Sequence, residues 1–186
     1  MGHPLRLGLA LLLGLWLALA RAGSIEPVRA NLLPTDDGYA LSAEFNIDLG
    51  HRVEEAVARG IPLYFNLEFE LTRSRWYWTS EQVVERTLNY RLSYHPLTRQ
   101  YRLGTGALYR TFDSLDEALR ALRRVAALPV AERSAVKQGE NYQAAVRLYL
   151  DRSQLPKPFQ LDAIGNRDWD ISSRVLRWQP QAGELK

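Results

Sequence analysis

Apolar and polar side chains alternate with a period of two along residues 61–72. The residues of one parity are Ile61, Leu63, Phe65, Leu67, Phe69 and Leu71, and the other parity includes Asn66, Glu68, Glu70 and Thr72. Because successive side chains of a β-strand point to opposite faces, this pattern predicts a strand with one buried and one solvated face. Sheets that face water on one side are antiparallel, so the pattern favours an antiparallel fold over a parallel α/β fold.

The same alternation recurs along most of the chain. Further strands are predicted over residues 39–49, 84–94, 101–103, 108–112, 142–150 and 170–178, with a weaker candidate over 26–33. Asp36-Asp37-Gly38 and His95-Pro96-Leu97-Thr98 are typical of the turns that join antiparallel strands. About eight strands with short connections predict a mainly β fold, an antiparallel β-sandwich. No linker or repeat interrupts residues 23–186, so we expect a single domain there.

One or two short helical insertions are expected within this sandwich. Ser114 followed by Glu117 has the pattern of a capping box, and apolar residues then recur at helical spacing as far as Val125. A shorter helix is predicted over residues 51–59, because glycine at the next position is typical of a helix end. The prolines of residues 155–159 predict an extended segment that crosses between the sheets.

The N-terminal segment has the pattern of a signal peptide. Leu7–Ala20 is an unbroken run of 14 apolar or glycine residues. As a helix this run would measure about 21 Å, less than the ~30 Å hydrocarbon core of a bilayer. The small residues of Ala20-Arg21-Ala22 predict cleavage before Gly23, which would remove residues 1–22 and leave a periplasmic chain that is not integral to the membrane. An uncleaved N-terminal anchor is the alternative interpretation.

The charge and cysteine content exclude several classes of protein. The full chain carries 24 basic and 21 acidic residues, and loss of residues 1–22 with their two arginines would leave a net charge of +1. A near-neutral protein lacks the basic surface that nucleic-acid binding requires. The absence of cysteine excludes a lipid-anchored lipoprotein, disulfides and thiol chemistry.

The charges are nevertheless segregated along the chain. Residues 73–110 contain seven arginines and two glutamates, whereas residues 23–72 contain three arginines and nine acidic residues. Pairing of acidic with basic strands across the sheets is the preferred explanation, and a surface for an anionic partner is the alternative.

No catalytic, cofactor-binding or metal-binding motif is recognisable in the sequence. A serine hydrolase would need a Gly-x-Ser-x-Gly elbow together with His51 or His95, and we interpret these histidines as surface or capping residues. Their spacing is not that of a zinc site. Glu68 and Glu70 share one polar strand face, where a carboxylate pair serves either acid–base catalysis, calcium binding or simple solvation. We therefore expect a non-catalytic protein without cofactor or metal.

Residues 73–78 combine arginine with aromatic side chains. The parity of the preceding strand would direct Arg73 and Arg75 into the core, where an unpaired charge is costly, so we expect the strand to leave the core near Thr72. Arginine and aromatic residues are enriched at binding hot spots, although tryptophans at this place would also close one end of the sandwich. The candidate binding residues are Arg73, Arg75, Trp76, Tyr77 and Trp78.

Several longer motifs resemble a known family. They are Arg75-Trp76-Tyr77-Trp78, Tyr90-Arg91-Leu92-Ser93-Tyr94, Thr98-Arg99-Gln100-Tyr101-Arg102, the run Leu150–Gln160 and Arg167-Asp168-Trp169-Asp170. Together they resemble the family called domain of unknown function 4390, exported proteins of proteobacteria, over nearly the whole mature chain. The resemblance implies a signal peptide, a mostly β periplasmic domain and genes that lie near those of a membrane sensor kinase. The family has no assigned activity, so the resemblance supplies no catalytic residues for this chain.

The last of these motifs also has an ordinary structural interpretation. Arg167, Asp168 and Asp170 surround Trp169, and they predict an ion-paired bracket over a buried indole. Trp169 and Trp178 are expected to lock the last strand into the sandwich.

Three classes of function are consistent with these observations. The preferred one is a non-catalytic binding or accessory domain for an envelope protein partner, such as a sensor's extracytoplasmic region, recognised through residues 76–78 and the nearby arginines. The second is an envelope carbohydrate hydrolase that uses Glu68 and Glu70. The third is a structural or lipid-binding protein of the envelope.

Overall fold

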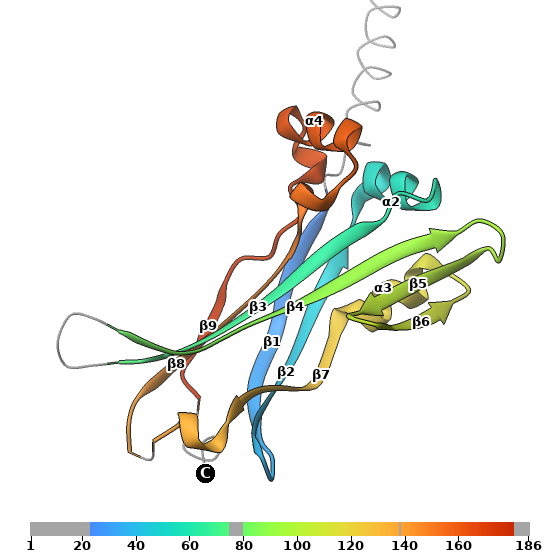
Figure 1. The fold of residues 1–186 in the computed structure, drawn as a ribbon. Helices are drawn as coiled ribbons and strands as arrows, with labels where there is room; N and C mark the ends of the chain where they lie inside the picture. Colours follow the sequence, from blue (N-terminus) through green and yellow to red (C-terminus); the bar gives the residue numbers. More distant parts are fainter. Residues whose placement is uncertain (1–22, 75–79, 138, 181–186) are drawn as a thin grey trace, which may run out of the picture.

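The computed structural model describes residues 23–74, 80–137 and 139–180 (Figure 1). The strands are β1 (Ser24–Pro34), β2 (Gly38–Asp48), β3 (Leu63–Arg73), β4 (Glu81–His95), β5 (Gln100–Thr105), β6 (Leu108–Phe112), β7 (Arg124–Glu132), β8 (Tyr142–Leu150) and β9 (Leu176–Trp178). The helices are α2 (Gly50–Ala58), α3 (Leu115–Arg123) and α4 (Lys157–Gly165), with single 3₁₀ turns η1 (Arg133–Ala135), η2 (Arg152–Gln154) and η3 (Arg167–Trp169). The prediction of a mainly β, antiparallel fold with short helices is confirmed.

The strands form two antiparallel sheets. The smaller sheet has the order β1-β2-β7, and the larger has the order β6-β5-β4-β3-β8-β9. The alternating segment noted first in the sequence becomes β3, which lies inside the larger sheet and pairs with β4 and β8 along its length. The smaller sheet lies across the larger one, and α3 lies beside the β5–β6 hairpin (Figure 1).

The two sheets enclose one hydrophobic core, which is filled by the apolar side chains at alternate positions of the strands. Strands β2, β3 and β8 each contribute a row of alternate residues to this core. These residues are Tyr39, Leu41, Ala43, Phe45 and Ile47 from β2, Leu63, Phe65, Leu67, Phe69 and Leu71 from β3, and Tyr142, Ala144, Val146, Leu148 and Leu150 from β8. The residues between them point to the outer faces, as strand geometry requires. The outer face of the larger sheet is therefore lined by polar and aromatic side chains.

Helix α3 begins where the sequence predicts. Ser114 Oγ accepts a hydrogen bond from the Glu117 amide at 3.2 Å, so the serine caps the helix. The helix buries Ala118, Leu119 and Leu122 against β2 and β5. It ends at Arg123, two residues earlier than predicted, because Val125 already belongs to β7 and pairs with β2.

The C-terminal segment that contains η2, α4 and η3 differs from the prediction. Residues 155–159 were expected to be extended, but α4 begins at Lys157 with Pro158 in its first turn. Proline is tolerated there because the first amides of a helix have no intrahelical acceptor. The expected strand over 170–178 is also shorter, because the regular strand β9 covers only Leu176–Trp178, whereas Ser172 meets β8 in an isolated bridge with Tyr149.

One end of the molecule carries α2, α4 and the first residues of β1 (Figure 1). Ser24 of β1 pairs with Asp48 of β2, directly before α2. A Cβ atom at Gly23 would lie 2.3 Å from the Leu49 carbonyl oxygen, so only glycine fits at this point without displacing the backbone. No helix within the described residues is long and apolar enough to cross a membrane.

Candidate functional site

Arg73, the first of the predicted binding residues, is a buried member of β3. We expected the strand to leave the core near Thr72, but β3 continues through Arg73. Its guanidinium forms an ion pair with Glu81 and a second with Glu140, in which Nη1 lies 2.8 Å from Oε2. The hydrogen bond with Glu81 is the largest cause that raises the pKa of Arg73. The charge is thus paired rather than unpaired, which is why the core tolerates it.

The rest of the predicted binding segment and most of the cleavage site lie outside the described residues. This applies to Arg75, Trp76, Tyr77 and Trp78, and to Ala22 on the N-terminal side of the expected cleavage site. Their assignment stays a prediction. Gly23, on the other side of that site, is the first described residue.

The candidate catalytic carboxylates lie on the outer face of the larger sheet, as predicted. Glu68 accepts a hydrogen bond from the Tyr149 hydroxyl at 2.7 Å, and Glu70 is exposed and lies opposite Glu85 of β4. Glu68 therefore has a structural partner on β8. The hydrogen bond from Asn66 lowers the pKa of the Tyr149 hydroxyl, but Glu68 and partial burial prevail and raise it.

The two histidines are found in the positions expected for capping or surface residues. His95 Nδ1 lies 3.4 Å from the Thr98 amide that donates to it, within the turn between β4 and β5. His51 is exposed on α2. Among the described residues, no group of three or more histidine, cysteine, aspartate or glutamate side chains is placed to hold a metal ion.

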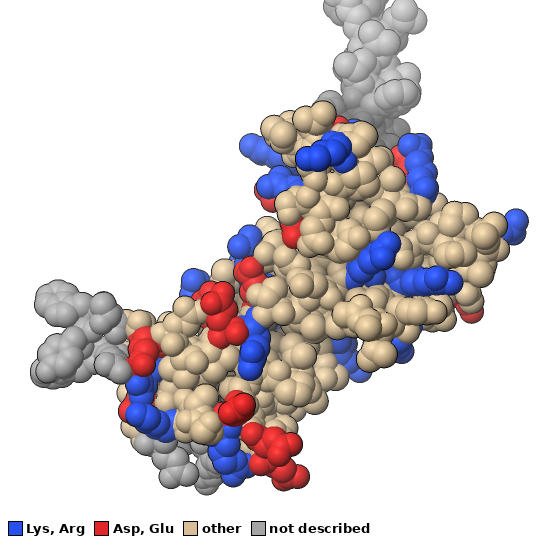
Figure 2. Space-filling model, viewed as in Figure 1, with Lys and Arg blue, Asp and Glu red and all other residues tan. Residues whose placement is uncertain are grey.

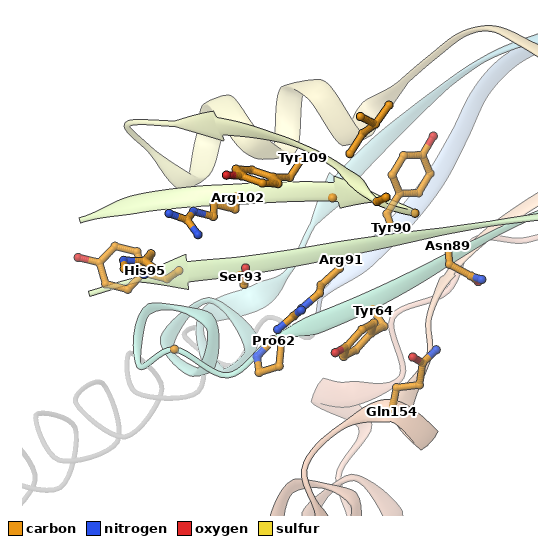
Figure 3. Close-up of a pocket in the computed structure, with 16 residues that line it drawn as sticks. Pro62, Tyr64, Asn89, Tyr90, Arg91, Ser93, His95, Arg102, Tyr109 and Gln154 are labelled. Carbon is orange, nitrogen blue, oxygen red and sulfur yellow. The ribbon is translucent and has the colours of Figure 1, made fainter. Parts of the chain in front are cut away.

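A groove of about 530 Å³ lies on the outer face of the larger sheet (Figure 3). Its floor consists of outward residues of four neighbouring strands, and the α2–β3 connection and η2 form one side. The floor residues are Tyr64, Asn89, Arg91, Ser93, Arg102, Gly104 and Tyr109, and the side residues are Gly60, Pro62 and Gln154. Strand register brings them together, because Tyr64 pairs with Arg91, Ser93 with Arg102 and Gly104 with Tyr109.

Two arginines give this groove its chemistry. The guanidinium carbon of Arg91 lies 5.8 Å from the centre of the Tyr64 ring, and that of Arg102 lies 5.2 Å from the centre of the Tyr109 ring. An aromatic face orients a guanidinium while its N–H edge stays available to a ligand. Arg102 Nε is buried and has no hydrogen-bond partner in the part of the chain that the structure describes.

The groove is also electrostatically one-sided. None of its lining residues, all of which are described, is an aspartate or glutamate. Basic side chains lie over the ends of β4 and β5 (Figure 2). Burial raises the pKa of Tyr90, so that phenol stays neutral at physiological pH. The arrangement suits a ligand that supplies carboxylate or phosphate oxygens together with an apolar contact for Leu108 and Tyr109.

The groove could not be located from the sequence, although the uneven distribution of arginine along the chain was related to it. The arginine excess of residues 73–110 includes Arg91 and Arg102, and an anionic-partner surface was the alternative explanation for that excess. The preferred explanation, pairing with acidic strands, does not hold for these two arginines, because each stacks on a tyrosine. It does hold for Arg73 of the same segment, which forms ion pairs with Glu81 and Glu140.

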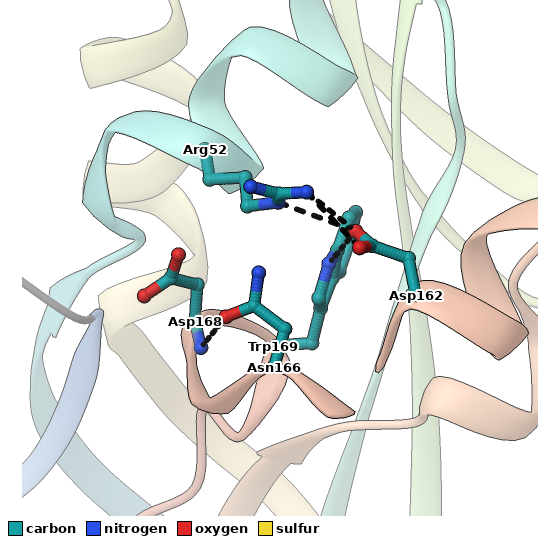
Figure 4. Close-up of polar contacts among 5 residues, drawn as sticks. All are labelled: Arg52, Asp162, Asn166, Asp168 and Trp169. Carbon is teal, nitrogen blue, oxygen red and sulfur yellow. Dashed lines mark hydrogen bonds and ion pairs between the residues drawn. The ribbon is translucent and has the colours of Figure 1, made fainter. Parts of the chain in front are cut away.

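A second polar cluster fixes α4 to α2 (Figure 4). Trp169 Nε1 donates to Asp162 Oδ2 at 2.8 Å, and Arg52 donates to both carboxylate oxygens of Asp162 at 3.0 Å. The expected bracket of Arg167, Asp168 and Asp170 is therefore wrong, since the indole is fully buried but Asp162 and Arg52 supply the ion pair. Asp162 lies on α4, a helix that the sequence did not predict, so the role of its carboxylate was not predicted either.

Replacing Asp162 with asparagine is expected to destabilise the protein near pH 7, and less at lower pH. The hydrogen bonds from Trp169 and Arg52 lower the pKa of Asp162 below the ordinary value of an aspartate. A group with a lowered folded-state pKa contributes stability above its unfolded pKa and loses it as pH falls through the folded value. Urea unfolding of both proteins at pH 7 and through the acidic range, past the lowered pKa of Asp162, measures this difference.

The matched control for that measurement is Asp116→Asn. Asp116 pairs with Arg120 on α3, but both side chains are exposed. An exposed pair contributes little, so this variant should remain close to the wild-type protein at both pH values. A difference for Asp162→Asn that is independent of pH would contradict the assigned role of the carboxylate.

Comparison with known proteins identifies one family. The family model described as domain of unknown function (DUF4390) matches residues 22–179. No curated protein and no solved structure matches the chain.

Proposed function

We propose, from the premise that this chain belongs to the DUF4390 family of domains of unknown function, that it is an exported, non-catalytic binding domain for an envelope protein partner. The apolar run Leu7–Ala20 and the small residues before Gly23 support export and cleavage of a signal peptide. The partner, for which a sensor's extracytoplasmic region is one candidate, binds through an acidic segment in the groove of the larger sheet.

The observation that supports this proposal is the pair of tyrosine-stacked arginines in a groove without carboxylates. Arg91 and Arg102 carry charge that no acidic lining residue neutralises. A planar guanidinium binds a carboxylate through two parallel hydrogen bonds. An acidic peptide segment therefore restores the missing counter-charge of the groove.

The openness of the groove favours a protein segment over a small enclosed ligand. Leu108 at its rim is 80% exposed, and Tyr109 on its floor is 63% exposed. Arginine and tyrosine beside exposed apolar side chains have the composition of interface hot spots. The tryptophans of residues 76–78 remain a candidate from the sequence alone, because they lie outside the described residues.

Site-specific photocrosslinking in the native envelope tests this function. A photoreactive amino acid at Tyr109 should capture one partner, whereas the same amino acid at Val28, which is similarly exposed on β1, should not. The captured peptide should be acidic, and the purified chain should begin at Gly23. Capture of the same proteins from both positions would contradict a binding role for the groove.

Charge reversal separates specific recognition from general adhesion. The double variant Arg91→Glu/Arg102→Glu is expected to reduce capture by about tenfold or more, because each arginine then repels the acidic segment. Arg29→Glu is the matched control, since Arg29 is an exposed arginine of β1 that pairs with Glu44. Equal losses in the double variant and the control would remove the groove from the proposal.

A further inference from the structure

Helix α4 exposes apolar side chains on the face that does not pack against the protein. Ala163 is buried and Phe159 packs against Trp169, with ring centres 5.8 Å apart. On the other face, Leu161 is 73% exposed and Ile164 is 83% exposed, and Pro158 is exposed as well. Positions 158, 161 and 164 are three residues apart, so they form one stripe along the helix.

This stripe lies at the end of the molecule where the apolar run Leu7–Ala20 joins the domain. Gly23 lies against the backbone of Leu49, just before α2. The bidentate ion pair between Arg52 of α2 and Asp162 fixes α4 to the same end. Only Arg21 and Ala22 separate the apolar run from Gly23, and three peptide steps span at most about 10 Å.

The charges around the stripe complement an anionic surface. Arg152, Lys157 and Arg167 are exposed on η2, α4 and η3, and no ion pair within the described residues involves them. Asp162 is neutralised by Arg52, whereas Asp168 is half-buried on η3 and Asp170 is exposed after it. Lys or Arg side chains are visible over this end in Figure 2.

We propose that, before cleavage at Gly23, the exposed stripe of α4 is a lipid-contacting surface that docks the domain on an anionic membrane while Leu7–Ala20 of the uncleaved chain resides in that membrane. Leu161 and Ile164 enter the headgroup region, and the three basic side chains contact lipid phosphates. The stripe is too small for lasting attachment alone, but the apolar run holds Gly23, at the same end of the domain, within about 10 Å of the bilayer, so a weak contact by the stripe suffices. This surface is separate from the groove and does not depend on its role.

An environment-sensitive fluorophore can report this contact directly, because the chain has no cysteine of its own. The full-length chain with Ile164→Cys, labelled with a nitrobenzoxadiazole dye, is reconstituted in vesicles of phosphatidylethanolamine and phosphatidylglycerol. Transfer of the dye from water to lipid should raise its emission about twofold or more and protect it from iodide. The matched control is a label at Leu33→Cys, at the opposite end of β1, which should stay quenchable.

Further arms separate the possible occupants of the stripe. Phosphatidylcholine vesicles should weaken the response at position 164, because they remove the anionic charge that the basic residues contact. Leu161→Ser in the labelled chain should weaken it as well. Equal responses at positions 33 and 164, or continued iodide access at 164, would overturn the proposal. A response in native envelopes but not in lipid vesicles would assign the stripe to a protein partner and overturn the lipid assignment.

Discussion

Replacing Trp169 with alanine is expected to lower the free energy of unfolding by about 3–5 kcal/mol, the usual cost of removing a large aromatic side chain from a core. The Trp169 side chain is fully buried, contacts the Phe159 ring and donates to Asp162. The substitution would leave a cavity between α4, α2 and the larger sheet. Urea unfolding followed by circular dichroism measures the change without relying on tryptophan emission.

A pair of phenylalanine variants separates the hydrogen bond of the indole from its volume. Trp169→Phe removes an N–H that donates to Asp162, whereas Trp178→Phe removes a buried Nε1–H that has no partner within the described residues. We expect the first to cost about 2 kcal/mol, and the second to remain within about 1 kcal/mol of wild type. Equal losses would show that packing alone accounts for the contribution of Trp169.

The substitution Gly38→Ala is expected to destabilise the protein by about 3 kcal/mol or more, at the upper end of the effects of single substitutions. A Cβ atom at this position would lie 2.1 Å from the Ala131 carbonyl oxygen and 2.9 Å from the Glu132 Cα atom. Both are backbone atoms of β7, so neither can rotate away. The methyl group would have to separate β2 from β7, where Gly38 pairs with Glu132.

Gly104→Ala is the matched control, because Gly104 also lies within a strand. A Cβ atom there meets nothing closer than 3.5 Å, which is ordinary van der Waals contact. Adding a methyl group at such a position reduces the freedom of the unfolded chain, so we expect a change of less than about 1 kcal/mol. Urea midpoints of the two variants should therefore differ widely, and similar midpoints would contradict the close approach of β7 to Gly38.

Local sequence patterns were sufficient for the elements that depend on local physics. Alternation along residues 61–72 predicted β3, and Ser114 predicted the start of α3, because strand parity and helix capping act over a few residues. β7 was not predicted, since its residues follow α3 without a loop and Val125 was assigned to the helix. Its strand character comes from pairing with β2, which lies far away in the sequence.

The candidate site was harder to predict from the sequence, because it too depends on the pairing of strands. Arg91 and Tyr64 are ordinary strand residues until the register of β3 and β4 places them opposite one another. Likewise, the segregation of arginine was visible in the sequence, but whether each arginine meets a carboxylate or a tyrosine depends on the order of six strands. Asp162 was missed because α4 itself was missed.

The order of strands in the two sheets also has a consequence for the time course of folding. β2 and β3 each keep an open edge until β7 and β8 are available, since Leu41 pairs with Leu128 and Phe65 with Leu150. Such distant pairings close slowly. A chain threaded through a translocation pore from its N-terminus would therefore stay uncollapsed until most of it had crossed, and during that interval its unpaired edges would need protection from aggregation.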